Sequence, residues 1–96
     1  MDPEQFFRIA KALADPTRFE IFQRIACGGE VGCQRLVEDL PVSQPTVSHH
    51  LKELSVAGLI EPRREGQFIH YRVRPGVFDA YIDALRTRVG GTVAEA

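Results

Sequence analysis

The chain has 96 residues, of which 44% are hydrophobic and 26% are charged, and its formal net charge is −1. This length predicts a single domain that buries roughly 60–65% of its unfolded surface, with a small core that would gain from self-association. No apolar run approaches the ~20 residues that span a bilayer, and the N-terminus is acidic where a signal peptide is basic and then apolar. We therefore expect a cytoplasmic protein with no membrane partner, whose thiols are reduced rather than paired in a structural disulfide.

The charge is unevenly distributed along the chain. Residues 46–75 contain five basic and three acidic side chains, whereas both flanking segments contain more acidic than basic residues. Nucleic-acid affinity depends on the local field more than on the total charge. A mildly acidic protein can therefore bind DNA through this one segment.

Hydrophobic spacing predicts two helices in the first third of the chain. Residues 4–14 have one broad apolar face, which consists of Phe6, Phe7, Ala10 and Leu13. Asp15 followed by Pro16 is typical of a helix start, here of a helix that runs to about Ala26 and is stopped by two glycines. We expect this second helix to bury Phe19, Ile25 and either Ile21 or Phe22.

Residues 33–57 are typical of a helix-turn-helix. A short helix over residues 32–39 must end before Pro41, because proline disfavours the helical region at the residue before it. Ser43 then caps a longer helix that runs to about Ala57. Its buried stripe contains Val47, Leu51 and Leu54, and His50 lies near that stripe. The opposite side is polar, small and hydrogen-bonding, which suits the base edges of a DNA groove better than a protein core.

Residues 59–73 change to the period of a β-hairpin. The hairpin turns at residues 65–67, and Pro62 restricts its first strand to a sheet edge. A last helix over residues 75–90 starts at Pro75 and has an apolar stripe wider than one small core requires. We expect residues 91–96 to be a disordered tail. The predicted fold class is mainly α with a small β-hairpin: a winged helix-turn-helix of about five helices and a two-stranded wing.

Three segments match a known family: ALADPTR at residues 12–18, SQPTVSHHL at residues 43–51 and LSVAGLI at residues 54–60. Through them the chain resembles the ArsR-type (arsenic-repressor-like) family of bacterial winged helix-turn-helix regulators over roughly residues 6–88. The resemblance implies a homodimer joined through its first and last helices, residues 1–14 and 75–90. Such a dimer sits on operator DNA and represses transcription until a ligand or an oxidation event releases it.

The metal-binding residues of the family are not matched. Many members carry two cysteine ligands with one residue between them, and here Gly32 and Gln34 occupy those positions while Cys33 lies between them. A second family site on the last helix would need a histidine beside Asp79 and Asp83. We therefore expect no metal site and no cofactor.

Two groups of side chains are expected to contact double-stranded operator DNA. On the longer helix of the helix-turn-helix, Ser43, Gln44 and Lys52 suit phosphates, whereas Thr46, Ser48 and His49 suit base edges. In the hairpin, the side chains that suit phosphates or the minor groove are Arg63, Arg64, Gln67 and Arg72. The sequence does not decide which arginine does so. The alternative is an ordinary solvated surface, on which the arginines only protect a sheet edge.

The apolar excess at both ends of the chain predicts a homodimer interface. Its expected members are Phe6, Phe7, Phe78, Tyr81, Ile82 and Leu85. Cys27 and Cys33 allow two interpretations. They either pack as ordinary small residues, or form a thiol pair that binds arsenite or a soft metal, or is oxidised, and so shifts the following helix. The small-molecule or redox inducer is not identified by the sequence.

A winged-helix module that binds another protein is the alternative function. Such a face should expose large apolar anchors, and the polar side of the longer helix exposes none. An enzyme is not expected, because no Ser-His-Asp set, carboxylate pair or phosphate-binding glycine loop occurs at usable spacing. The sequence therefore predicts a homodimeric, sequence-specific DNA-binding transcriptional regulator, and specifically a repressor.

Overall fold

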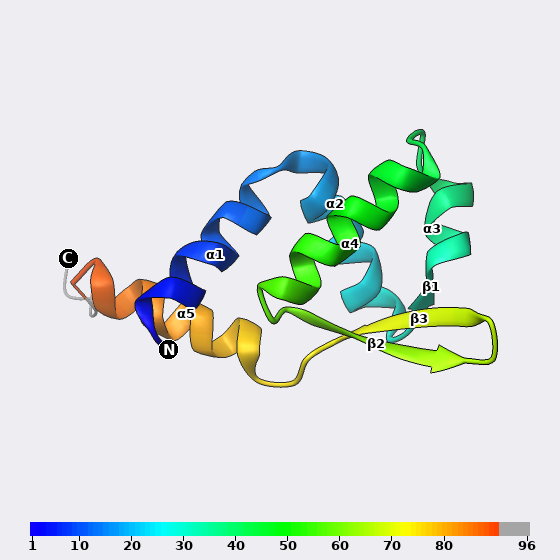
Figure 1. Cartoon of the computed structure of the whole chain (residues 1–96). Coiled ribbons are helices and arrows are strands. Elements are labelled where there is room, and N and C mark those ends of the chain that lie inside the picture. Colours follow the sequence, from blue (N-terminus) through cyan, green and yellow to red (C-terminus); the bar gives the residue numbers. More distant parts are fainter. Residues whose placement is uncertain (91–96) are drawn as a thin grey trace.

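The computed structural model describes residues 1–90, so the tail predicted at 91–96 lies outside the described residues. Five helices and three strands occur within residues 1–90 (Figure 1). The helices are α1 (Pro3–Ala14), α2 (Pro16–Gly28), α3 (Cys33–Asp39), α4 (Gln44–Val56) and α5 (Val77–Arg88). The strands are β1 (Val31–Gly32), β2 (Ile60–Glu65) and β3 (Phe68–Val73). The predicted winged helix-turn-helix is confirmed, and none of the helices in this part of the chain is long and apolar enough to cross a bilayer.

Side-chain caps explain where α2 and α4 begin. The carboxylate of Asp15 accepts a hydrogen bond from the backbone amide of Arg18 at 2.8 Å. The hydroxyl of Ser43 accepts one from the amide of Thr46 at 3.4 Å. Both oxygens satisfy first-turn amides that have no partner within the helix. The helix starts predicted at Asp15 and Ser43 are therefore confirmed.

Two helix boundaries differ from the prediction because of glycine conformation. Helix α2 extends through Gly28, slightly past its predicted end, and the chain leaves the helix at Gly29, where φ is 79°. Helix α5 begins at Val77 rather than at Pro75. Gly76 has a left-handed φ of 82°, which lies outside the helical region, so the helix can start only after it.

The wing belongs to an antiparallel sheet with the strand order β1-β3-β2. Strand β1 pairs Val31 with Tyr71 and Gly32 with His70. The sequence predicts only a two-stranded wing, because the two residues of β1 are too few to show the alternation of a strand. This third strand connects the wing to the segment between α2 and α3.

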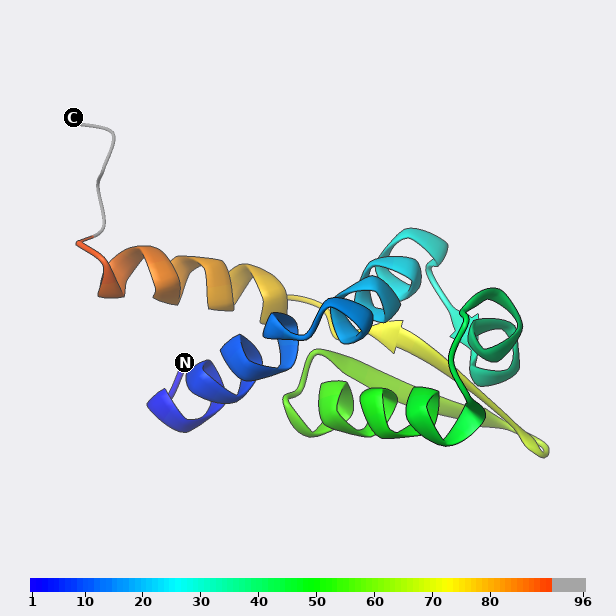
Figure 2. The same cartoon turned by 90° about the horizontal axis from the view of Figure 1, so that it is seen from above.

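The hairpin of β2 and β3 runs beside α4 (Figures 1 and 2). Pro62 lies in β2, an edge strand of the sheet, as predicted. The loop contains two residues, Gly66 and Gln67, where a three-residue turn was expected. A positive φ of 62° at Gly66 is typical of the tight turns that match the twist of paired strands. The hairpin turn lies at the same end of the molecule as α3 and the start of α4, and α1 and α5 lie at the other end.

The core lies between α1, α2, α4 and the base of the wing. Its largest fully buried side chains are Ile9, Ile21, Ile25, Leu36, Val47, Leu51, Leu54, Leu59 and Ile60. The buried stripe predicted for α4 is confirmed, since its three members are at most 1% exposed. Helix α2 buries Ile21, Phe22 and Ile25.

The direction predicted for Phe19 is wrong, and Phe7 lies outside the core of the single chain although it belongs to the predicted apolar face of α1. Phe19 is 38% exposed, because it lies about 120° around α2 from the buried Ile25. Phe7 is 56% exposed, because α1 turns Phe6, Ile9 and Ala12 toward the core. The other two members of the predicted α1 face, at positions 10 and 13, are half-buried. The predicted burial of Ile25 and of either Ile21 or Phe22 is confirmed, whereas the burial predicted for Phe19 is not.

Candidate nucleic-acid interface

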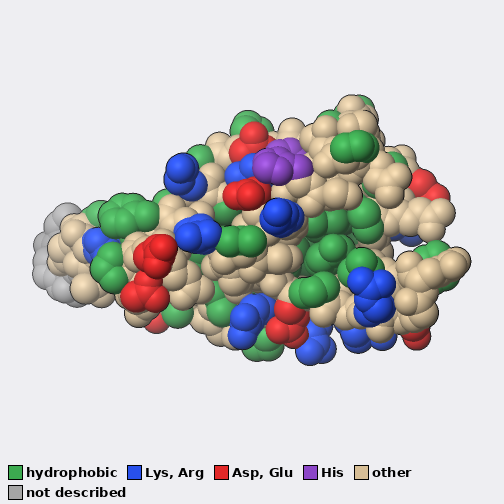
Figure 3. Space-filling view, in the orientation of Figure 1, with side chains coloured by type: hydrophobic (Ala, Val, Ile, Leu, Met, Phe, Trp, Pro, Cys, Tyr) green, Lys and Arg blue, Asp and Glu red, His purple; other side chains and the backbone are tan. Residues whose placement is uncertain are grey.

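The polar side of α4 is exposed along most of its length. Gln44, Ser48, His49 and Lys52 are exposed, as is Ser43 just before the helix. The hydroxyls of Thr46 and Ser43 lie 3.0 Å apart, and Thr46 is half-buried, so its hydroxyl takes part in the helix cap. Among the side chains expected at base edges, Ser48 and His49 are therefore the most accessible. Figure 3 shows histidine and basic side chains over α4.

His50 lies on the buried side of α4 and is only 8% exposed. Its Nδ1 accepts a hydrogen bond from Nε of Arg18 at 3.2 Å, and its Nε2 lies 3.8 Å from Oδ2 of Asp15. Burial lowers the pKa of His50, and the nearby carboxylate of Asp15 opposes that effect. The pKa of Asp15 is itself lowered, first by the hydrogen bond from the Arg18 amide. The prediction that His50 lies near the buried stripe is confirmed.

The wing arginines lie on two different faces of the hairpin. In the β2–β3 register Arg63 is opposite His70 and Arg72 is opposite Glu61, whereas Arg64 is opposite Ile69. Because side chains alternate along a strand, Arg63 and Arg72 share one face and Arg64 lies on the other. The face of Arg64 also carries Ile60, Tyr71 and Val73, the hairpin side chains that pack against the core.

Two of these arginines are held by carboxylates within the chain. Arg63 donates two hydrogen bonds to Glu30, at 2.6 and 2.9 Å, and Arg72 donates one to Glu61 at 2.6 Å. The bonds from Arg63 are the main cause that lowers the pKa of Glu30. Arg64 is exposed and forms no ion pair with any described residue. The structure therefore separates the arginines that are bound by carboxylates from Arg64, which the sequence could not do.

A groove of about 840 Å³ separates α3 and α4 from the wing. Gln44 and Ser48 line it from α4, and Gln67 lines it from the hairpin turn, so residues predicted separately for DNA contact meet here. Phe68 also lines the groove and is 52% exposed, although the sequence analysis did not select it. Its place next to the hairpin turn was the available signal. Figure 3 shows hydrophobic side chains between α4 and the wing.

The comparisons with known proteins agree with this geometry. The sequence model of a helix-turn-helix domain family matches residues 13–63, more than half of the chain. An arsenical resistance operon repressor from Staphylococcus aureus is 34% identical over 85 residues, which are 88% of this chain and 81% of that protein. The chain belongs to the ArsR-type family of winged helix-turn-helix regulators.

Two further ArsR-type proteins show how far the similarity extends. An arsenic resistance transcriptional regulator from Pseudomonas putida is 40% identical over 77 residues; these are 80% of this chain but only 59% of that protein. The solution structure of a homodimeric winged helix-turn-helix DNA-binding domain from Mycobacterium bovis has a TM-score of 0.71 and 32% identity. The match covers 94% of this chain and 82% of that domain. The domain is described as part of a possible ArsR-family transcriptional regulator.

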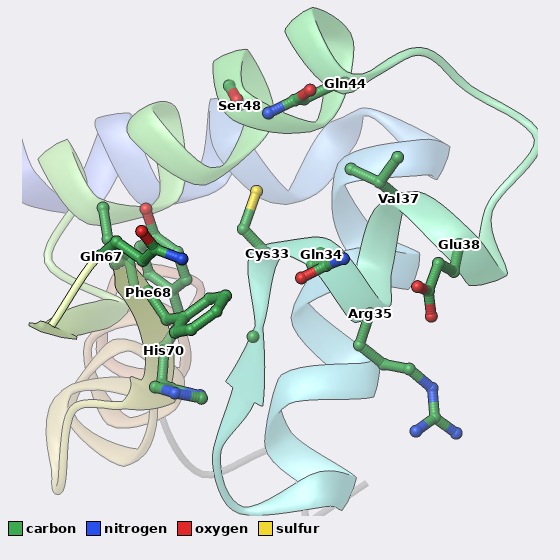
Figure 4. A pocket seen from close by; sticks show the side chains of 13 residues that line it. Cys33, Gln34, Arg35, Val37, Glu38, Gln44, Ser48, Gln67, Phe68 and His70 are labelled. Carbon is green, nitrogen blue, oxygen red and sulfur yellow. The ribbon is translucent and has the colours of Figure 1, made fainter. Parts of the chain in front are cut away.

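In this ArsR-type chain the two cysteines lie in different places. Cys33 lines the groove between α4 and the wing, and its sulfur points toward the side of α4 that carries Gln44 and Ser48 (Figure 4). Cys27 is exposed and lines a separate hollow with Glu30 and other residues near the end of α2. Both thiols are free. The structure places the two thiols in different hollows and shows no disulfide between them.

Residues that could hold a metal ion do not converge in the described part of the chain. Among residues 1–90, no group of three histidine, cysteine, aspartate or glutamate side chains has the arrangement of a metal site. Gly32 and Gln34 flank Cys33 at the start of α3, and neither supplies a thiolate.

The side chains predicted for a dimer interface differ in burial within the single chain. Phe6 and Tyr81 are 4% and 9% exposed, and their ring centroids lie 5.2 Å apart in the core of the single chain. Ile82 is half-buried, and the exposed members are Phe7, Phe78 and Leu85. All of them lie on α1 and α5, at the end of the molecule away from the wing turn (Figure 2).

Proposed function

We propose that this chain is a homodimeric, sequence-specific DNA-binding protein that represses transcription from an operator. The observation that carries the proposal is the setting of α4, which buries its apolar stripe and exposes a polar side next to the wing. A helix in this setting fits the major groove, where each base pair presents its own pattern of donors and acceptors. The similarity to the arsenical resistance operon repressor from Staphylococcus aureus supports repression as the outcome.

The accessible side chains suggest separate roles in binding. Ser48 and His49 contact base edges in the major groove, whereas Gln44 and Lys52 contact phosphates and fix the position of the helix. Arg64 reaches phosphate or the minor groove from the wing, because it is exposed and its charge is not neutralised by a carboxylate in residues 1–90. Arg63 and Arg72 contribute less, since each is already bound by a carboxylate.

A dimer follows from the apolar side chains exposed on α1 and α5. Phe7, Phe78 and Leu85 keep more than a third of their surface exposed in one chain. Joining two copies through this end removes that surface from water and directs the two α4 helices at successive half-sites about 34 Å apart. The homodimeric domain from Mycobacterium bovis supports this arrangement.

Release from DNA is proposed to follow a ligand or a thiol modification rather than arsenic bound between two family cysteines, which this chain lacks. Cys33 is the thiol that supports this proposal, because it lines the same groove as Gln44 and Ser48. An adduct on its sulfur would occupy space between α4 and the wing. DNA could then not contact both elements together.

The direct test is the affinity of purified protein for the DNA upstream of its own gene, compared with a scrambled duplex by fluorescence anisotropy. We expect tighter binding to the upstream DNA. His49→Ala should reduce the discrimination between the operator and single-base variants about 5- to 150-fold. Val56→Ala, at an exposed position near the other end of α4, is the matched control and should change neither affinity. Equal affinity of the wild type for both duplexes would contradict the proposed function.

Arg64→Ala should weaken binding to operator and scrambled DNA by the same factor and reduce the salt dependence by about one phosphate contact. The comparison is Arg72→Ala, which removes a wing arginine that Glu61 already holds. We expect the Arg72 variant to lose less affinity than the Arg64 variant in salt titrations. A larger loss for Arg72→Ala would show that the assignment of wing roles is wrong.

Phe7→Glu should convert the dimer into a monomer, because it places a charge in the apolar surface that two copies would bury. Phe19→Glu changes another exposed phenylalanine on a different helix and should remain dimeric. Sedimentation velocity at several protein concentrations measures both. If Phe7→Glu sediments as the wild-type dimer does, the interface lies elsewhere.

Arsenite or dilute peroxide should release wild-type protein and Cys27→Ser from operator DNA but leave Cys33→Ser bound. Gel-shift assays on reduced and treated protein make this comparison, with intact mass confirming which thiol reacted. Tight binding that no treatment disturbs would exclude thiol modification and leave a non-covalent ligand as the signal.

A further inference from the structure

Two segments that lie far apart in the sequence meet at His50. Arg18 and Asp15 belong to the start of α2, and His50 lies in the middle of α4. Arg18 Nε donates to His50 Nδ1 at 3.2 Å, and the Asp15 carboxylate that lies 3.8 Å from His50 Nε2 is fixed by its bond to the Arg18 amide. His50 is the one buried polar side chain in residues 1–90. Arg18 and His50 thus connect the core side of α4 to a helix cap.

This hydrogen bond is possible in only one protonation state of His50. A guanidinium has donors and no acceptor, so Nδ1 must be the acceptor and the imidazole must be neutral with its proton on Nε2. Protonation of His50 would place two donors face to face and remove the bond. Burial, which lowers the pKa of His50, favours the neutral form that the bond requires.

The bond can set the rotation of α4 more narrowly than the hydrophobic core does. Apolar contacts through Leu51 and Leu54 are non-directional, whereas a hydrogen bond weakens steeply when its angle changes. His49 directly precedes His50 and is exposed, and the two ring centroids lie 5.8 Å apart. A rotation of the helix that moved His50 would therefore also move the neighbouring side chain that is proposed to contact bases.

We propose that Arg18 is a positioning residue for DNA recognition, which binds neutral His50 and so holds the polar side of α4 in the orientation that reads the operator. The proposal rests on the DNA-binding function argued above. It assigns no DNA contact to Arg18 or His50. Their effect reaches the DNA through the placement of Ser48 and His49.

The charged groups around His50 predict how operator binding depends on pH. Asp15 and Arg18 face it from α2, and His49 is its charged neighbour on α4. The hollow beside Asp15 and Arg18 is also lined by Glu4, Arg8, Lys11 and Glu53. Because the pKa of His50 is lowered from its ordinary value of 6.5, the bond is present at neutral pH and is lost as the pH falls through that lowered value.

A double-mutant cycle tests the coupling. Operator affinity is measured by anisotropy for the wild type, Arg18→Met, His50→Leu and the double variant, with a scrambled duplex in parallel. We expect each single change to weaken operator binding roughly tenfold and the double change to weaken it no further. The scrambled duplex and the salt dependence should not change. Lys11→Met removes a cation from the same hollow without touching His50, and should leave operator binding close to that of the wild type.

His50→Asn separates the hydrogen bond from the titration. The amide oxygen of Asn lies near the position of Nδ1, so it can accept from Arg18, but it does not titrate. This variant should retain operator binding within about threefold at pH 7 and should lose less affinity than the wild type as the pH falls toward about 5. It also provides a test if His50→Leu fails to fold.

Three outcomes would overturn the proposal. One is additive effects of the two single changes, and another is a salt dependence that Arg18→Met lowers by about one contact, as a lost phosphate contact would. The third comes from nitrogen-15 NMR of the histidine ring, which needs no DNA. We expect the Nε2–H tautomer for His50, a higher pKa in Arg18→Met and shifted amide signals along α4. An unchanged His50 titration and unchanged α4 signals would exclude the positioning role even if the wild type bound no operator at all.

Discussion

The burial of one side of α4 is the constraint on which the rest of this structure depends. Val47, Leu51 and Leu54 are removed from water, so the side that carries Ser48 and His49 must face outward. Immediately after α4, Leu59 and Ile60 are also buried, at 0% and 1% exposure. The first residue of the wing is therefore attached to the same core, and the hairpin cannot move freely relative to α4.

Charge within the wing is arranged so that few cations remain available. Glu30 holds Arg63, and Glu61 holds Arg72 while lying 3.7 Å from Arg74. These pairs are exposed and contribute little to stability, but they neutralise cations that would otherwise attract any polyanion. Under the proposed function, the basic segment then acts mainly through Lys52 on α4 and Arg64 on the wing. A protein with this arrangement gains more of its DNA affinity from groove contacts than from unspecific attraction.

The sequence predicted local features well and tertiary partners less well. The caps at Asp15 and Ser43 and the buried stripe of α4 depend on residues within one or two helical turns, and all were confirmed. Strand β1 exists only because β3 pairs with it, so two residues of sequence could not reveal it. The direction of Phe19 depends on which side of α2 meets α4, which the spacing of its apolar residues left open.

The candidate interface shows the same division. The exposed side of α4 followed from its helical period, whereas the pairing of Arg63 with Glu30 joins residues from different elements that no local pattern connects. The proposed role of Arg18 also depends on a contact between different elements. Arg18 lies in one segment that matches the family and its partner His50 lies in another. Only the fold shows that these two segments are in contact.

The end of the molecule formed by α1 and α5 links DNA binding to protein concentration. Within residues 77–88 only Tyr81 is buried, and the Arg88 guanidinium lies 4.3 Å from the ring centroid of Phe6 and 5.0 Å from that of Phe7. A single chain thus holds α5 through Tyr81, through half-buried side chains that pack against the core and through the Phe78 ring, whose centroid lies 5.7 Å from that of Phe22. Part of the apolar surface of α5, such as Leu85, remains exposed. Association of two chains would bury the apolar side chains of α5 that one chain leaves exposed. It would also fix the separation of the two α4 helices in the same step. Operator affinity should then depend on dimer formation, because a monomer presents only one α4 helix to the DNA.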